Sequence, residues 1–350
     1  KTAYDGWLDP VAYDRIGELL GEARAKRAQF GHPPVREVGI YFSARSRDWI
    51  GRDNPAIWFQ SVQGAHKACV YEHLGFGFLF DENLSLDNLK QFPVVCLPNT
   101  GILTEREVDL FRRYVEDGGK LLVTGHSGQF DRMGKPLTAS TLEGLIGAKV
   151  KGRRGDADSW MRFRGIKTAV EQKAAVKRKA KWSEVELEEV LGDYDAIQAV
   201  VDAALASNGH PNWPFLVRGP ATVYAPTTAA SVGDLLDSHR AALANPGGYN
   251  ADWPLSARQV VGPAVLINFV GKGAVLTFAG SPDFATASEH HIVEARKLFA
   301  NAVRLLHPGP RVRVDAPANV EAVVTDDPAT RTLRVHLIAY HAPPQTTPVK

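Results

Sequence analysis

The chain has 350 residues, of which 44% are hydrophobic and 23% are charged, and its formal net charge at pH 7 is +2. This is the composition of an ordinary globular protein with room for two or three domains. It excludes a disordered or fibrous chain, while so small a charge argues neither for nor against a polyanionic partner.

No apolar run approaches the roughly 20 residues that a membrane-spanning helix needs, so we expect no contact with a membrane. The two cysteines, Cys69 and Cys96, each lie in an apolar stretch, Cys69 in a helical pattern and Cys96 in a strand. Such residues are typical of small core side chains rather than of a disulfide framework. We therefore expect a cytoplasmic protein.

A helical pattern comes first in the chain. Asp9 and Pro10 fit an N-cap and the first helical position, and the helix is expected to continue to about Phe30. Its apolar stripe consists of Ile16, Leu19, Leu20 and Ala23. Residues 31–34 are predicted to be a linker, so no neighbouring segment is predicted to cover this stripe.

A repeated pattern of strands and helices follows from residue 38. The expected elements are strands at 38–42, 75–80, 94–97 and 120–124, and helices at 55–74 and 104–117. Thr104 and Glu107 form a capping-box pattern at the start of the second helix. Because the strands are apolar without alternation, they predict a doubly wound, mostly parallel α/β sheet of the flavodoxin or amidotransferase type. Ligands of such sheets gather beyond the carboxyl ends of the strands, here residues 98–101 and 125–128.

The pattern is less regular after residue 128. The expected elements are a short helix at 141–146, strands at 160–163, 223–225, 264–270 and 274–280, and a long helix at 287–306. Residues 165–210 are dominated by helix formers, with a basic run answered by acidic residues, so we expect a solvated helical insertion and no nucleic-acid partner. From residue 311 onward apolar and polar residues alternate, which predicts a partial antiparallel β domain.

Two residues could act as nucleophiles. Ser127 lies in the segment 125–129, close to the G-x-S-x-G elbow of hydrolases, but Gln129 replaces the last glycine and no clear helix follows. Cys96 lies inside its strand rather than on a turn after it, where a thiolate would act. The sequence therefore favours a polar loop for Ser127 and a core position for Cys96, and an enzyme that uses either residue remains the alternative.

A third group has the residue types of a metal site. It consists of Asp283, His290, His291 and Glu294. The spacing of His290 and Glu294 allows them to share one helix face, but no third ligand is fixed by spacing. We therefore expect the surface of a helix start and no metal.

The loop after the first strand suits a polyhydroxylated ligand. It carries Arg45, Arg47, Asp48, Trp49, Arg52 and Asn54. Planar donors and acceptors match sugar hydroxyls, and an indole ring stacks on a sugar face. Asn99, His126 and Ser127, at the ends of the other strands, complete the predicted substrate-binding set.

Several segments together resemble a known family. They are residues 38–43, 92–99, 114–124 with the pair Gly118–Gly119, 127–131, 301–306, 315–321 and 333–340. They look like the β-galactosidase trimerisation domain, the amidotransferase-like second domain of family-42 β-galactosidases, followed by the small C-terminal β domain of those enzymes. The resemblance covers residues 35–150 and 215–341.

The resemblance implies a division of the chain and a role for it. Residues 1–34 would be the end of a preceding (β/α)8 barrel, residues 35–310 the trimerisation domain with its insertion near 165–210, and residues 311–350 the start of a C-terminal β-sandwich. In this family the catalytic carboxylates belong to the barrel, so the resemblance implies no catalytic residue, cofactor or metal here. It also implies a homo-oligomer, with a trimer as one form, and a carbohydrate substrate at a site shared with the barrel.

Three functions remain open from the sequence. They are a non-catalytic assembly and active-site-rim module of a glycoside hydrolase, an independent amidotransferase-like or carbohydrate-utilisation enzyme, and a structural or interaction protein. We expect no glycoside hydrolysis by the isolated chain, because the required carboxylate pair is not evident. We expect self-association near Trp49 and Trp58, two aromatic residues that could be exposed. We also expect an internal piece of a longer protein, with the stripe of residues 16–23 bare or packed on another chain.

Overall fold

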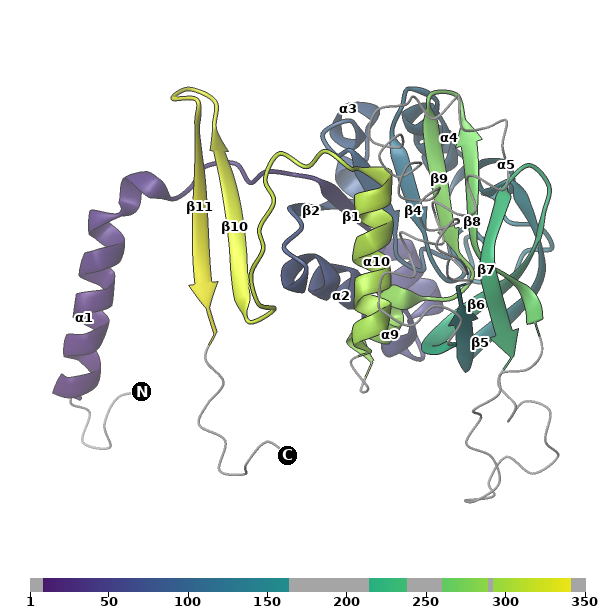
Figure 1. The fold of residues 1–350 in the computed structure, drawn as a ribbon, viewed down its shortest axis with the longest axis horizontal. Coiled ribbons are helices and arrows are strands. Elements are labelled where there is room, and N and C mark those ends of the chain that lie inside the picture. Colours follow the sequence, from purple (N-terminus) through teal and green to yellow (C-terminus); the bar gives the residue numbers. More distant parts are fainter. Residues whose placement is uncertain (1–8, 164–213, 238–259, 289–291, 341–350) are drawn as a thin grey trace, which may run out of the picture.

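The computed structural model describes residues 9–163, 214–237, 260–288 and 292–340. Within these residues a mixed nine-stranded sheet with α/β character forms the centre, and a separate two-stranded hairpin lies beside it (Figure 1). The strands of the sheet, in order across it, are β2 (Phe76–Phe80), β1 (Val38–Phe42), β3 (Val94–Leu97), β4 (Lys120–Val123), β9 (Gly273–Phe278), β8 (Val260–Val270), β7 (Ala230–Asp237), β5 (Ala148–Arg162) and β6 (Phe215–Pro226).

The sheet has a parallel half and an antiparallel half. Strands β2, β1, β3, β4 and β9 run parallel, with Ile40 beside Cys96 and Cys96 beside Leu122. From β9 to β6 each strand is antiparallel to its neighbour. The prediction of a mostly parallel sheet is therefore correct for the first half only. The direction changes at the tight turn between β8 and β9, where Gly271 has a φ of 58°, a conformation that glycine adopts without strain.

Helices cover both faces of the parallel half (Figure 1). The connection from β1 leads to β2 in one direction across the sheet and that from β3 leads to β4 in the other, so right-handed crossovers place their helices on opposite faces. The helices of this part are η2 (a π-helix, Ser46–Ile50), α2 (Pro55–Tyr71), η3 (a 3-10 helix, Asp81–Asn83), α3 (Leu86–Leu89), α4 (Glu105–Glu116), α5 (Glu143–Ile146), α9 (Pro282–Ala287) and α10 (Val293–Leu306). Helices α2, α9 and α10 pack against one another.

Helix α4 forms as its sequence predicts. Thr104 Oγ1 accepts a hydrogen bond from the Glu107 amide at 3.3 Å, and Glu107 Oε2 accepts one from the Thr104 amide at 2.7 Å. This reciprocal pair completes the predicted capping box. The apolar residues buried on the helix are Val108, Phe111, Tyr114 and Val115.

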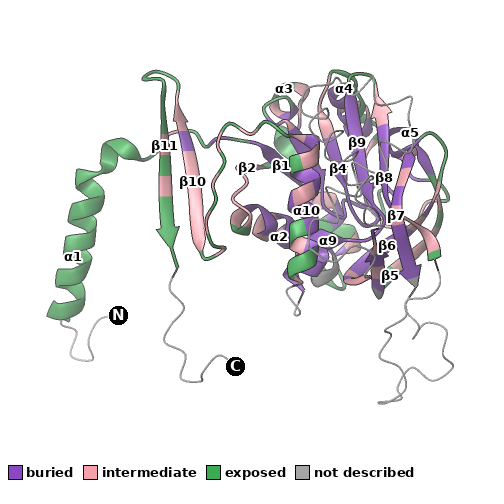
Figure 2. Cartoon of the chain, viewed as in Figure 1, coloured by how far each residue is buried: buried purple, intermediate pink, exposed green. Residues whose placement is uncertain are grey.

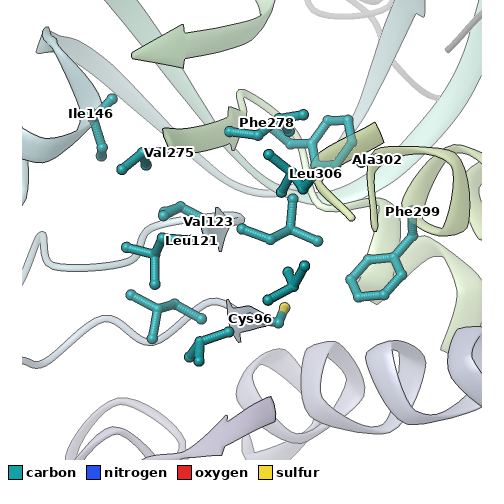
Figure 3. Close-up of a cluster of buried hydrophobic side chains, with 14 of the residues drawn as sticks. Cys96, Leu121, Val123, Ile146, Val275, Phe278, Phe299, Ala302 and Leu306 are labelled. Atoms are coloured by element: carbon teal, nitrogen blue, oxygen red, sulfur yellow. The ribbon is translucent and has the colours of Figure 1, made fainter. Parts of the chain in front are cut away.

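The core lies between the central strands and their helices. Every residue of β3 is buried, as expected for a strand that is covered on both faces. Figure 3 shows Cys96 of this strand in a cluster with Leu121 and Val123 of β4 and Phe299 of α10. The expected core position of Cys96 is confirmed, and Cys69 is likewise a buried free thiol.

Four elements lie beside the sheet: α1 (Pro10–Ala25), η1 (a 3-10 helix, Arg27–Gln29), β10 (Val320–Asp327) and β11 (Thr332–Ala339) (Figure 1). Helix α1 has no buried residue, and Figure 2 shows it exposed along its length, so its apolar stripe is bare. The ring of Phe30 stacks on His336 of β11 at 5.4 Å between ring centroids. Pro34 forms a β-bridge with Thr325 of β10. The N-terminal segment is thus tied to the hairpin, whereas the stripe of α1 has no cover among the described residues.

Several expected elements differ from the observed ones. The helix expected at 287–306 is observed from Val293 to Leu306, while Ala287 ends the preceding helix α9, because the backbone of Ser288 is extended, with φ −60° and ψ 165°. The strands expected at 160–163 and 223–225 are the end parts of β5 and β6, which pair over most of their length. The insertion expected at 165–210 lies outside the described residues. None of the described helices is long and apolar enough to cross a membrane.

Candidate functional site

The strand order identifies one edge of the sheet as the place where a ligand would be expected. The chain leaves β1 toward β2 on one side and continues with β3 on the other, so the carboxyl ends of β1 and β3 form a topological switch point. Ligands of open α/β sheets bind at such points. The segments that meet there are residues 43–50, 98–102 and, after β4, 124–129. All predicted substrate-binding residues except Arg52 and Asn54 lie in these three segments.

The π-helix η2 fills the switch point. The expected polar loop is wrong here, because the backbone after β1 coils at once, and the Gly51 amide bonds back to the Ser46 carbonyl at 3.1 Å. Ser46 Oγ accepts a hydrogen bond from the Ile102 amide at 3.1 Å. A Cβ atom at Gly101 would overlap the Ile50 side chain. The Ile50 side chain thus packs directly on the backbone of Gly101.

Arg45 has a structural position. Its Nη1 lies 2.5 Å from Glu107 Oε1 and 3.8 Å from Asp81 Oδ2. Tyr41 donates its hydroxyl proton to Asp81 Oδ1 at 2.7 Å. The two carboxylates that the fold brings together here therefore share one arginine, and Glu107 also caps α4. This arrangement links β1, η3 and α4 and leaves neither carboxylate placed as a free acid or base.

The other residues of the loop form an exposed rim. Arg47 donates from Nε to Asp48 Oδ1 at 2.6 Å, and this hydrogen bond lowers the pKa of Asp48. Trp49 is 42% exposed. Behind it the chain passes close to Gly134, where a Cβ atom would lie 3.2 Å from the Trp49 carbonyl oxygen. Asn54 is exposed before α2 and its side chain makes no cap. The rim therefore presents an indole beside a paired guanidinium and carboxylate, which are groups that suit a sugar.

Trp58 does not belong to this rim. It is only 1% exposed, and its ring packs edge-on against Phe42 at 4.7 Å between centroids. The expectation that Trp58 is exposed is wrong, because α2 turns this side chain toward the sheet.

Ser127 is buried and fully engaged in hydrogen bonds. Its Oγ accepts from the Thr100 amide at 2.8 Å and lies within donating distance of two carbonyl oxygens, Thr124 O at 2.8 Å and Leu97 O at 3.0 Å. No solvent reaches the side chain. Ser127 therefore ties the end of β3 to the end of β4, a position that does not suit a nucleophile.

His126 and Asn99 complete this buried group. The Asn99 Oδ1 atom accepts from the His126 amide at 2.9 Å, and His126 Nε2 lies 3.0 Å from the Ala221 carbonyl oxygen, to which it can only donate. Burial lowers the pKa of His126. The ring is thus held neutral and is turned to β6 rather than to Ser127. The structure brings Asn99, His126 and Ser127 together, but they are buried, whereas the rim at Trp49 is exposed.

Among the candidate site residues, Asn99 has the strained backbone conformation. Asn99 has a φ of 47°, whereas neither Ser127 nor Cys96 is among the residues of positive φ in the described chain. A nucleophile on a sharp turn would have such a conformation. Burial raises the pKa of the Cys96 thiol well above its usual value. Neither sequence candidate for a nucleophile has the exposure or the activation that the chemistry requires.

Sequence reasoning did not find the polar cluster next to His126. Gln129 donates from Nε2 to Thr222 Oγ1 at 2.9 Å and accepts at Oε1 from Arg153 Nε at 2.8 Å. Thr222 belongs to β6 and Arg153 to β5, far from Gln129 in the chain. No local pattern could have indicated this cluster, because it depends on the pairing of distant strands.

Asp283 has a different position from the one that its neighbours in the sequence suggested. It is fully buried, and its Oδ2 accepts from Thr124 Oγ1 at 2.6 Å. His290 and His291 lie outside the described residues. Among the residues that the structure describes, no three His, Cys, Asp or Glu side chains are placed to hold a metal. Asp283 is therefore part of the polar group below the carboxyl edge.

Comparisons with known proteins place the fold. Neither a protein-family model nor a curated protein matches the sequence. A GH42 β-galactosidase from G. stearothermophilus is similar in structure, with 14% identity, a TM-score of 0.61, and coverage of 93% of this chain and 38% of that one. The β-galactosidase from Rahnella sp. R3 gives 15% identity, a TM-score of 0.60, and coverage of 93% and 39%.

A third similar structure has another sugar specificity in its name. The α-L-fucosidase isoenzyme 2 from Paenibacillus thiaminolyticus shares 15% identity, with a TM-score of 0.68 and coverage of 99% of this chain and 44% of that one. The chain spans less than half of the length of each of these structures. At such identities the likeness shows that this chain shares a fold with part of each of these enzymes.

Proposed function

We propose that this chain is a non-catalytic assembly and active-site-rim module of a β-galactosidase-like glycoside hydrolase. The observation that supports this most directly is the likeness of fold over 93% of the chain to two β-galactosidases. The chain covers only 38% to 39% of those structures, so a module of a larger enzyme fits better than a complete one. In this proposal residues 35–310 are the trimerisation domain, residues 1–34 end a barrel, and residues 311–350 begin a β-sandwich.

The contacts of the site support a binding role rather than a catalytic one. Ser127 and Cys96 are buried, and the carboxylates of Asp81 and Glu107 are ion-paired with Arg45. Glycoside hydrolysis needs one carboxyl group as acid and a second as base or nucleophile, each free to reach the sugar. The exposed rim at Trp49 has no such chemistry, but it can stack on a sugar ring and donate to its hydroxyls.

The rim is tested by sugar binding to the intact chain. Saturation-transfer NMR with millimolar galactose should give a signal for the wild type and for Tyr340→Ala, which removes an exposed aromatic residue of the hairpin region. Trp49→Ala should lose it, because the stacking surface is gone. Equal signals from Trp49→Ala and the wild type would show that the rim does not bind the sugar.

The absence of catalysis is tested on the same material. We expect the pure chain to release no product from aryl β-galactosides over many hours. Turnover that Ser127→Ala or Cys96→Ala abolishes would contradict the proposal and would favour an independent enzyme.

A further inference from the structure

Asp283 is a buried carboxyl group that has no charged partner among the described residues. No solvent reaches its side chain, Oδ2 has the hydrogen bond from Thr124, and Oδ1 has no hydrogen-bond partner among the described residues. An ionised carboxylate in an apolar interior is costly unless it is paired and fully hydrogen-bonded. The geometry therefore favours the protonated, neutral form.

No charge stands near to compensate an ionised Asp283. The ionisable side chains on the elements that pack against α9 are His66, Lys67, Cys69 and Tyr71 on α2, Arg218 and Tyr224 on β6, and Glu294, Arg296, Lys297 and Arg304 on α10. Within the described residues Asp283 has an ion pair with none of them. Burial raises the pKa of Asp283 to about 7, and the hydrogen bond from Thr124 and nearby backbone amides offset the effect only in part. From β3, the Cys96 thiol faces Asp283, and burial keeps it protonated.

Asp283 also stands at a tight contact between two helices. A Cβ atom at Gly64 of α2 would overlap the Asp283 carbonyl oxygen. The first residue before α9, Ser281, donates its hydroxyl proton to the Pro220 carbonyl oxygen of β6 at 2.6 Å. Helix α9 has only six residues, and both contacts hold its N-terminal turn, so a charge on Asp283 arises where the helix is fixed to its neighbours.

A chain of hydrogen bonds connects Asp283 with the strained turn after β3. The Asn99 amide donates to Thr124 Oγ1 at 3.0 Å, and Thr124 Oγ1 donates to Asp283 Oδ2 at 2.6 Å. Asn99, with its φ of 47°, in turn holds the His126 amide. A backbone conformation of this kind persists only where its surroundings fix it. A change in the protonation of Asp283 can thus affect the carboxyl edge of the sheet through two hydrogen bonds.

We propose that Asp283 is a proton switch for this edge. When protonated, it keeps α9 closed on α2 and holds Thr124 and the Asn99 turn in place. When its proton passes to bulk water, the buried carboxylate becomes costly, and the cost is removed only if α9 opens so that the carboxylate is solvated. This opening releases Thr124 and the turn at Asn99. The switch concerns the fold of this chain and does not depend on the proposed carbohydrate role.

Hydrogen exchange of the intact chain between pH 5 and 8 tests the switch. After correction for the intrinsic rate, opening of the segments 281–288 and 95–103 should rise up to about tenfold per pH unit and level off near the pKa of Asp283. Asp283→Asn keeps the shape without the titration and should show no such rise. Asp109→Asn, on the exposed face of α4, should behave as the wild type. Equal pH dependence in the wild type and Asp283→Asn would overturn the proposal.

A second variant tests the hydrogen-bond relay separately from the response of α9 itself. Thr124→Val removes the hydroxyl that joins Asp283 to Asn99, so segment 281–288 should still respond to pH while segment 95–103 should not. A joint response in this variant would contradict the hydrogen-bond relay. If Asp283→Asn fails to fold, infrared spectroscopy of the wild type decides the question. A protonated-carboxyl band that disappears as the pH rises through 7 supports the switch, and absence of that band at pH 5 refutes it.

Discussion

At the scale of single residues, the hydroxyl of Ser127 joins two parallel strands at their ends. It is the hydrogen-bond partner of the Thr100 amide, which is buried. Ser127→Ala should therefore lower the free energy of unfolding by about 1–3 kcal/mol, because it leaves a buried donor without a partner. Urea denaturation followed by circular dichroism measures this difference. An unchanged midpoint would mean that the turn can rearrange around the missing hydroxyl.

His126 gives a second prediction at this scale. The pH dependence of stability that it causes is opposite in sign to the one that Asp283 causes. Burial lowers its pKa in the folded state below the value of 6.5 expected when unfolded. At this residue the folded chain therefore binds fewer protons than the unfolded chain. The contribution of neutral His126 to stability is complete above pH 6.5 and decreases as the pH falls below this value. His126→Gln can still donate to the Ala221 carbonyl oxygen and does not titrate. Between pH 7 and 5 the melting temperature should fall more for the wild type than for His126→Gln.

At the scale of elements, the contact of α2 with α9 depends on a glycine. Gly64→Ala should destabilise the chain by about 1–3 kcal/mol, because its methyl group meets the backbone of Asp283 and the helices must separate. Gly144→Ala in α5 is the matched control, since no atom lies within 4 Å of the added carbon. The control should be neutral or slightly stabilising. Thermal denaturation of the two variants side by side measures this difference in stability. Equal midpoints would contradict the tight contact between α2 and α9.

The elements also show which features the sequence could predict. The capping box of Thr104 and Glu107 and the buried strand at Cys96 are local patterns, and both are present as expected. The β8–β9 pair is joined by a local turn, but the pairing of β5 with β6, such as Arg153 with Thr222, joins distant segments that no window of the sequence contains. The break at Ser288 was missed because the residues on both sides favour a helix. The packing of Ile50 on Gly101 was also missed, because it is a tertiary contact that no local pattern indicates.

At the scale of the whole molecule, the stripe of α1 and the outer strand β11 are among the apolar surfaces that lie open in the described part of the chain. Leu19 and Leu20 are 52% and 63% exposed. Exposed apolar faces of this kind favour association. We expect the isolated chain to form larger species through α1, in addition to the homo-oligomer proposed for the sheet domain.

Sedimentation velocity at micromolar concentration separates the two kinds of association. The double variant Leu19→Glu with Leu20→Glu should lose the larger species and keep a defined oligomer. Asp14→Lys is the control, since a rotation of about 100° per residue puts Asp14 opposite the stripe. A purely monomeric double variant would argue against the proposed assembly role of the sheet domain.

The position of β9 in the sheet also determines the order in which the chain can be built. β4 ends at Val123, whereas its parallel partner β9 begins only at Gly273. During synthesis the first half of the sheet therefore leaves the ribosome with the edge of β4 unpaired, and that edge is apolar. Such an edge is a template for wrong pairing, and domains that must wait for distant strands are prone to aggregation while they wait. We therefore expect the nascent chain to be more prone to aggregation, until its later strands arrive, than the finished sheet would suggest.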